Sequence, residues 1–255
     1  MANQLRPEQP ARGGQPARLA HPAKLGQPVV GWTPPARPSG ALLEGRYVRL
    51  ERLEADAHAG DLHRAYSGHE SLWDYLPYGP FASASAYHRW VKDTASGTDP
   101  LFYALRDRAT GHCGGVASYL RIAPDAGSIE VGHICLAPEI ARGRAWTEAM
   151  FLMLDWAFSA GYRRYEWKCD ALNLPSRRAA QRLGFSYEGV FRQMSVVKGR
   201  NRDTAWFSVI DSEWGAMREA YRAWLAPANF DAAGRQRERL SDLTQLVRPG
   251  SDPAI

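Results

Sequence analysis

The sequence has few cysteines and no long apolar run. Its 255 residues include only Cys113, Cys135 and Cys169, and no two of them share a C-x-x-C spacing. This pattern favours buried, reduced thiols over disulfides or metal ligands. No run of 18 apolar residues could span a membrane, and no apolar signal region follows Met1. We therefore expect a cytoplasmic protein with no metal ion and no membrane partner.

The folded part of the chain also lacks a large charge of either sign. The formal net charge is +5, and the first forty residues hold eight of the seventeen prolines. These forty residues carry +4 and leave only +1 for the rest, because their charged residues are Arg6, Arg12, Arg18, Lys24, Arg37 and Glu8. We predict that residues 1–42 are a Pro-rich basic tail, disordered or loosely docked. A solvated tail explains the positive charge better than a nucleic-acid partner does.

Residues 43–226 are predicted to form one α/β domain around a central mixed sheet. Strands are expected at 46–53, 101–107, 114–122, 129–136, 165–169 and 185–191, with a hairpin over 192–210. Helices are expected at 56–66, 85–94, 145–160, 175–183 and 213–225. Residues 227–255 are polar and charged, and we predict that they form a C-terminal extension.

One segment, Tyr165–Phe191, combines several local signals. A strand-like run ends in a polar turn that carries Asn173, and Pro175 then opens a short basic helix that ends before Gly184. Asn173 and Ser176 stand at the mouth of this helix, where free backbone N–H groups favour an anionic or amide-rich ligand. Taken alone, the segment is more typical of an ordinary strand–helix–strand connection than of a ligand site.

The preceding segment, Ser128–Ala160, shifts the balance towards a ligand site. A strand-like run leads to a loop with Arg142, Gly143 and Arg144, and the helix that follows is apolar on nearly every face. Such a helix must lie in a core. Its N-terminus stands next to two arginines, so we predict that it binds a pyrophosphate group.

Together, these motifs resemble the GNAT superfamily of N-acetyltransferases, and within it the branch of the ribosomal-protein N-terminal acetyltransferases RimJ and RimL. The resemblance covers residues 43–224. It rests on YVRLERL from Tyr47, EVGHICLAPE from Glu130, WTEAM from Trp146 and ALNLPSRRAAQRLGFSYEG from Ala171. It implies acetyl-CoA as the cofactor, an amine as the acetyl acceptor, and a twisted mixed sheet that opens around the cofactor and is flanked by helices.

The resemblance also implies which residues bind acetyl-CoA. The groove lies between strands 130–136 and 165–169, with the pyrophosphate over residues 142–147 and another part of the cofactor at Asn173. The implied set is Ile134, Leu136, Arg142, Gly143, Arg144, Ala145, Trp146, Thr147, Asn173 and Ser176. Arg144 stands where the family usually has glycine, and Trp146 stands where it usually has a small residue. A GNAT-fold binding or regulatory protein with weakened cofactor binding is therefore an alternative.

Acetyl transfer needs a neutral amine, hydrogen-bond donors for the developing oxyanion and a proton for the departing thiolate. Glu130 is the favoured base, directly or through a water, and His133 is second. A strand-face carboxylate paired with an arginine explains Glu130 equally well. The resemblance implies that Ser176 protonates the thiolate, although a hydroxyl that caps the helix fits this position somewhat better.

An aromatic loop is the predicted wall of the acceptor slot, and its alternative role is to cover the core. The predicted substrate-binding residues are Trp73, Tyr75, Tyr78 and Tyr119. An α-amine with a pKa near 7.7–8.0 is roughly 10–20% neutral at pH 7, against about 0.04% of a lysine amine. We therefore expect a protein or peptide α-amine as the acceptor, with a small-molecule amine, either an antibiotic or a polyamine, as the alternative. The protein is expected to be a monomer or a homodimer.

Overall fold

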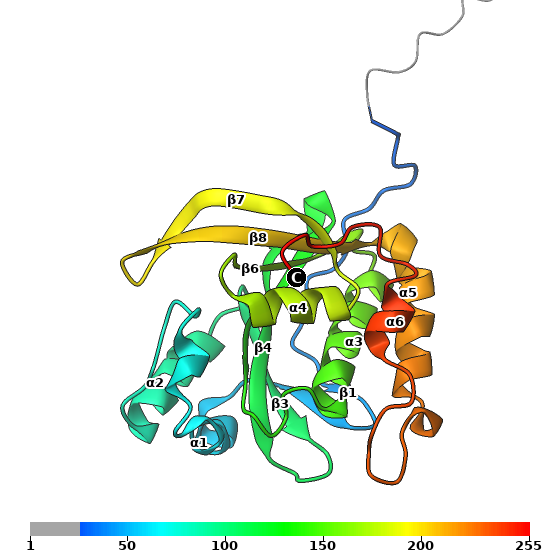
Figure 1. Cartoon of the computed structure of the whole chain (residues 1–255). Helices are drawn as coiled ribbons and strands as arrows, with labels where there is room; N and C mark the ends of the chain where they lie inside the picture. Colours follow the sequence, from blue (N-terminus) through cyan, green and yellow to red (C-terminus); the bar gives the residue numbers. More distant parts are fainter. Residues whose placement is uncertain (1–25) are drawn as a thin grey trace, which may run out of the picture. The chain divides into compact units, whose positions relative to one another are not determined.

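Eight strands form one sheet in the order β1-β2-β3-β4-β5-β6-β8-β7 in the computed structural model, which describes residues 26–255 (Figure 1). Neighbouring strands are antiparallel, except that β5 and β6 are parallel. The strands are β1 Leu43–Glu44, β2 Val48–Arg52, β3 Leu101–Asp107, β4 Cys113–Ala123, β5 Ser128–Leu136, β6 Arg164–Asp170, β7 Ser186–Val197 and β8 Arg200–Ile210. The predicted mixed α/β fold is confirmed.

Helices cover both faces of this sheet (Figure 1). Helices α1 and α2 lie on one face, and α3, α4 and α5 lie on the other. The α-helices are α1 Ala55–Tyr66, α2 Ala84–Ala95, α3 Arg144–Ser159, α4 Leu174–Arg182, α5 Asp211–Leu225 and α6 Leu240–Thr244, and the short 3-10 helices are η1 Glu70–Trp73, η2 Pro124–Ala126 and η3 Pro227–Asn229. The five predicted helices are confirmed to within one or two residues at each end.

Helix α3 is the central helix of the larger core cluster. Leu154 is fully buried, and Phe151 packs against the rings of Trp214 and Tyr221 of α5. Glu148 is also buried, although it is charged, because its carboxylate accepts backbone N–H bonds from Arg46, Tyr47 and Val48. These bonds tie the start of β2 to α3 and satisfy the buried charge.

Strands β5 and β6 pair over only part of their length. Their register runs from Ser128↔Arg164 to Val131↔Trp167, and no β6 residue pairs with Gly132–Leu136. His133 has a φ of +53° and lies where the β4–β5 register shifts, so the strand bulges there. The backbone of residues 132–136 therefore lines an opening in the sheet, and a loop over residues 137–143 leads from it to the N-terminus of α3.

The C-terminal segment packs on the side of the sheet that carries α3. Leu240 and Thr244 of α6 are fully buried, and α6 contacts both α4 and α5. Further along, the side chains of Asp252 and Arg177 form an ion pair and are 0% and 8% exposed. Residues 227–255, predicted as a polar extension, thus contribute to the packing around α4.

Two units are distinguished within the chain, residues 1–32 and 33–255. In the first unit the structure describes residues 26–32, which contain one turn at residues 30–31. The predicted tail lies largely outside the described residues. Among those described, no helix is both long and apolar enough to cross a membrane.

Candidate active site

The N-terminus of α3 has unoccupied backbone donors. Gly143 is the N-cap residue, no side chain caps the helix, and the first turn contains no acidic residue. The N–H groups of the first turn have no partner within an α-helix, and the helix dipole gives this end a partial positive charge. Arg142, just before the cap, has a φ of +65°. The geometry is suited to an anion.

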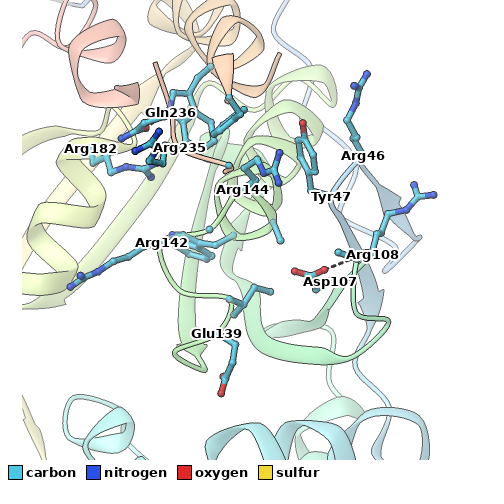
Figure 2. A pocket seen from close by; sticks show the side chains of 18 of the residues that line it. Arg46, Tyr47, Asp107, Arg108, Glu139, Arg142, Arg144, Arg182, Arg235 and Gln236 are labelled. Atoms are coloured by element: carbon cyan, nitrogen blue, oxygen red, sulfur yellow. Dashed lines mark hydrogen bonds between the residues drawn. The ribbon is translucent and has the colours of Figure 1, made fainter. Parts of the chain in front are cut away.

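A pocket of about 1150 Å³ opens over this helix end (Figure 2). Its wall includes seven arginines and only two acidic residues, Asp107 and Glu139. Two of these arginines are paired, Arg108 with Glu44 and Arg235 with Asp231. For the other five arginines, no carboxylate of residues 26–255 lies within 4.0 Å of the guanidinium. These five are Arg46, Arg142, Arg144, Arg178 and Arg182. The pocket is therefore suited to a ligand with several negative charges.

Arg144 and Trp146, which depart from the family pattern, both have packing roles. The Arg144 guanidinium lies between two rings, 4.8 Å from the centre of Tyr47 and 4.9 Å from that of Phe230. This arrangement ties the C-terminal segment to β2 through cation–π contacts. Trp146 is 5% exposed and packs in the core beneath the pocket. Neither side chain replaces the backbone donors of the helix end.

Helix α4 carries the predicted Asn173 and Ser176. The Asn173 side chain caps the helix by accepting the N–H of Ser176 at 3.0 Å. The Ser176 hydroxyl accepts a bond from Trp167 Nε1 at 3.0 Å and also interacts with the Cys169 sulfur. Thr147, also predicted to bind the cofactor, is buried and donates to the Gly143 carbonyl. Its hydroxyl therefore has a structural partner within α3.

Glu130 belongs to a ladder of alternating charges on the sheet face opposite α3. Its carboxylate lies 2.7 Å from Arg121 Nη1 and 2.9 Å from Lys168 Nζ. Lys168 also pairs with Glu166, which pairs with Arg164, which in turn reaches Glu188. Glu130 is 3% exposed, and burial raises its pKa while Lys168 and Arg121 act in the opposite direction. Both sequence readings of Glu130, base and ion-paired carboxylate, are compatible with this environment.

His133 lies at the bulge on the same face as Glu130. Its Nδ1 is 3.2 Å from the Tyr78 hydroxyl, and its ring stacks on Tyr78. Burial lowers the pKa of His133 to about 4, and Arg121 and Arg202 act in the same direction. The imidazole is therefore neutral at pH 7, and a group with this pKa is a weak base.

The predicted acceptor residues have different surroundings. Tyr75 is exposed and its hydroxyl donates to the Leu172 carbonyl beside α4, while Tyr78 faces His133. Trp73 is buried in the cluster beneath α1 and α2, but its carbonyl accepts a bond from Lys198 Nζ at the tip of the β7–β8 hairpin. Tyr119 is fully buried and donates to the Met153 carbonyl on the α3 side. We therefore reassign Tyr119 from acceptor binding to core packing.

Ile134 and Leu136, predicted at the cofactor groove, are half-buried on the α3 side of the opening between β5 and β6. Their side chains pack against the larger core, so their backbone groups are the ones that a ligand in the opening would meet. All three cysteines are buried and free, and burial raises the pKa of Cys113 and Cys135 to about 12. Within residues 26–255, no group of three or more acidic, histidine or cysteine side chains is arranged to hold a metal ion.

Several residues of the pocket and of the charge ladder were not identified from the sequence. Arg178 and Arg182 lie four residues apart after Ser176, so their common helix face was a readable signal. Lys168 lies two residues from Glu166 on β6, which places both on one face. Arg235 lies far along the chain, and nothing local predicts that it reaches the pocket.

Comparison with known families agrees with this architecture. The acetyltransferase (GNAT) domain family matches residues 48–186, which is more than half of the chain. The chain belongs to the GNAT family of acetyltransferases. It is accordingly an acyltransferase, and enzymes of this family use acetyl-CoA as the acetyl donor.

Three relatives show the range of similarity. A GCN5-related N-acetyltransferase from Brucella melitensis is 49% identical, with a TM-score of 0.82, over 84% of this chain and 99% of that one. An uncharacterized N-acetyltransferase p20 from Bacillus licheniformis is 30% identical over 65% of this chain and 95% of its own length. The RimL ribosomal L7/L12 α-N-protein acetyltransferase is 18% identical over 67% of this chain and 94% of that one, with a TM-score of 0.58, and shares the fold alone.

Proposed function

We propose that this GNAT enzyme acetylates the α-amine of a peptide or protein, the activity of the RimJ/RimL-like branch that its sequence resembles. The observation that carries this proposal is the cationic surrounding of Glu130. Glu130 is the only carboxylate on strand β5, and it lies just before the part of β5 that β6 leaves unpaired. Arg121 and Lys168 flank it. Burial raises the pKa of Glu130 against the effect of both cations, yet a carboxylate remains a far weaker base than an amine. It is therefore best matched to an amine that is already partly neutral.

The residues around α3 fit acetyl-CoA as the donor. The free N–H groups of the first turn of α3 and Arg142 would bind the pyrophosphate, since both offer donors to a dianion. Backbone groups of residues 132–136 are available to the pantetheine arm because β6 does not pair with them. Acetyl-CoA supplies an activated thioester, so no nucleophile of the protein is required.

The chain's own side chains would handle two protons. Glu130 would accept the proton of the amine, directly or through a water, on the face that carries Arg121 and Lys168. Ser176 lies on the opposite face, and Trp167 Nε1–H already donates to its oxygen. Ser176 would turn its proton from the Cys169 sulfur to the departing thiolate sulfur.

The charge on the acceptor face argues against polyamines and aminoglycosides. Arg121, Lys168, Lys198 and Arg202 lie near the opening or on the hairpin beside it, and Glu130 and Glu166 are already paired. A polycationic acceptor would be repelled there. A single α-amine carries at most one charge and is roughly 10–20% neutral at pH 7.

A panel of acceptors tests the proposal. The enzyme with saturating acetyl-CoA would be given three kinds of acceptor: a lysine-free peptide with a free N-terminus, the same peptide N-terminally blocked with one lysine added, and a polyamine or aminoglycoside. Thiol release reports turnover. We expect turnover only with the first peptide. Turnover of the lysine peptide or of the polycation, without turnover of the free N-terminus, would overturn the substrate assignment.

A further inference from the structure

One face of α4 extends the pocket away from the N-terminus of α3. Pro175, Arg178, Ala179 and Arg182 line the pocket and recur at the spacing of a single helix face. Arg182 donates to the Thr147 hydroxyl and stacks 5.2 Å from the Trp224 ring, and it pairs with no carboxylate in the described chain. An arginine held by a ring and a hydroxyl retains donors and a full positive charge for a ligand.

The C-terminal segment brings a second arginine to the same side. Asp231 orders a tight turn, because its carboxylate accepts the N–H groups of Ala233 and Arg235 and pairs with the Arg235 guanidinium. Trp224 Nε1 donates to Gln236 Oε1 at 2.8 Å, so the ring that supports Arg182 also holds this segment. Figure 2 shows Arg182, Arg235 and Gln236 gathered at one end of the pocket.

This end of the pocket is suited to a second phosphate group. Coenzyme A carries a 3′-phosphate on its ribose in addition to the pyrophosphate, and this phosphate approaches two negative charges at pH 7. In the proposed function, the N-terminus of α3 and Arg142 accommodate the pyrophosphate, which leaves Arg178 and Arg182 of α4 without a counter-charge. Arg235 is paired with Asp231 through Nε, and its exposed guanidinium keeps further N–H donors for a phosphate. We propose that Arg182 and Arg235 bind the 3′-phosphate, so that the C-terminal segment makes the enzyme selective for coenzyme A over its 3′-dephospho form.

The inference rests on the proposed donor site and is tested by binding rather than by turnover. Calorimetry would measure the dissociation constants of coenzyme A and 3′-dephospho-coenzyme A for the wild type, Arg235→Ala and Arg239→Ala. Arg235 is 82% exposed at its side chain, so its removal should leave the fold intact. Arg239 lies on the same segment, is exposed and does not line the pocket, which makes it a matched control.

We expect the wild type to bind coenzyme A at least tenfold more tightly than the dephospho form, in keeping with a charge-assisted contact. Arg235→Ala should weaken coenzyme A binding roughly five- to tenfold and leave the dephospho form unchanged, and Arg239→Ala should change neither. Equal binding of both ligands by the wild type, or equal losses for both in Arg235→Ala, would overturn the inference and leave the donor site standing. Failure of the wild type to bind coenzyme A at all would overturn both.

Discussion

At the scale of single residues, the ladder of ion pairs around Glu130 sets the environment in which this carboxylate would take up a proton. Glu130, Glu166 and Glu188 alternate with Arg121, Lys168 and Arg164 across four strands. Glu130 and Glu166 each meet two cations, which compensates for the loss of water, while the exposed Glu188 meets Arg164 alone. Glu130 differs from the other two in lying on β5, whose following residues Gly132–Leu136 are not paired with β6.

Replacing Glu130 by Gln should lower kcat about 10²–10⁴-fold, because the proposed general base is lost while the side-chain volume is kept. Glu166→Gln is the matched control, since Glu166 shares Lys168 with Glu130 and is its partner in the strand register. Hydrogen bonds from Arg164 and Lys168 lower the pKa of Glu166 against the effect of burial. Its loss should change kcat only a few-fold. Similar kcat losses in both variants would assign Glu130 a purely structural role.

His133 should make stability depend on pH below neutrality. Its folded pKa of about 4 lies below the ordinary value of 6.5, so the unfolded chain binds the proton first. The free energy of unfolding should therefore fall between pH 6.5 and pH 4, by up to ~3 kcal/mol from this residue. Asn tolerates the positive φ of this position. Urea unfolding would measure the free energy of unfolding of the wild type and of His133→Asn at pH 7 and pH 4.5. The two free energies should be closer at pH 4.5 than at pH 7. An equal difference at both pH values would contradict the assignment.

At the scale of elements, two helix N-termini form the predicted donor site, and the sequence indicated both. Asn173 and Pro175 mark the start of α4, and the apolar run after Gly143 marks α3, because capping and periodicity are local signals. Tyr119 was predicted to line the acceptor slot, but it packs in the core beside α3. The alternation of residues along a strand shows that the sheet has two faces, but it does not show which face packs against α3. The partial pairing of β5 and β6 was expected from family resemblance, since no local pattern encodes where a parallel pair ends.

Asn173 has a capping role and a proposed ligand role, and two substitutions separate them. Asn173→Ala should lower stability by about 1 kcal/mol through loss of the cap and weaken acetyl-CoA binding several-fold. Asn173→Ser keeps a capping oxygen but lacks the amide N–H donors. Thermal unfolding should show stability restored in the Ser variant, while calorimetry shows affinity still reduced. Wild-type affinity in Asn173→Ser would restrict Asn173 to capping.

At the scale of the whole molecule, residues 227–255 are part of the folded unit. Phe230 completes the ring pair around Arg144, and Asp252 neutralises the buried Arg177 of α4. These contacts join residues 75 or more positions apart, so composition alone suggested only a polar extension. The wall of the pocket beside Arg182 follows from the same long-range packing.

Asp252→Ala should lower the free energy of unfolding by about 3–5 kcal/mol, because it leaves the buried Arg177 guanidinium without its carboxylate. Glu219→Ala removes the partner of Arg222 in an exposed ion pair and serves as the control. That change should stay within about 1 kcal/mol of wild type. Denaturant unfolding at pH 7 measures both. A loss below 1 kcal/mol for Asp252→Ala would mean that this end of the chain contributes little to the fold.

The tryptophans around the proposed donor site have an optical consequence. Trp146 lies beneath the pocket, Trp167 bonds to Ser176, and Trp224 supports Arg182. Indole emission responds to the polarity and charge of its surroundings, so a phosphorylated nucleotide entering here should change the intrinsic fluorescence without any added label. Titration with acetyl-CoA should give a saturable change in emission, and Trp224→Phe should remove part of its amplitude. The protein thus carries its own reporter of donor binding.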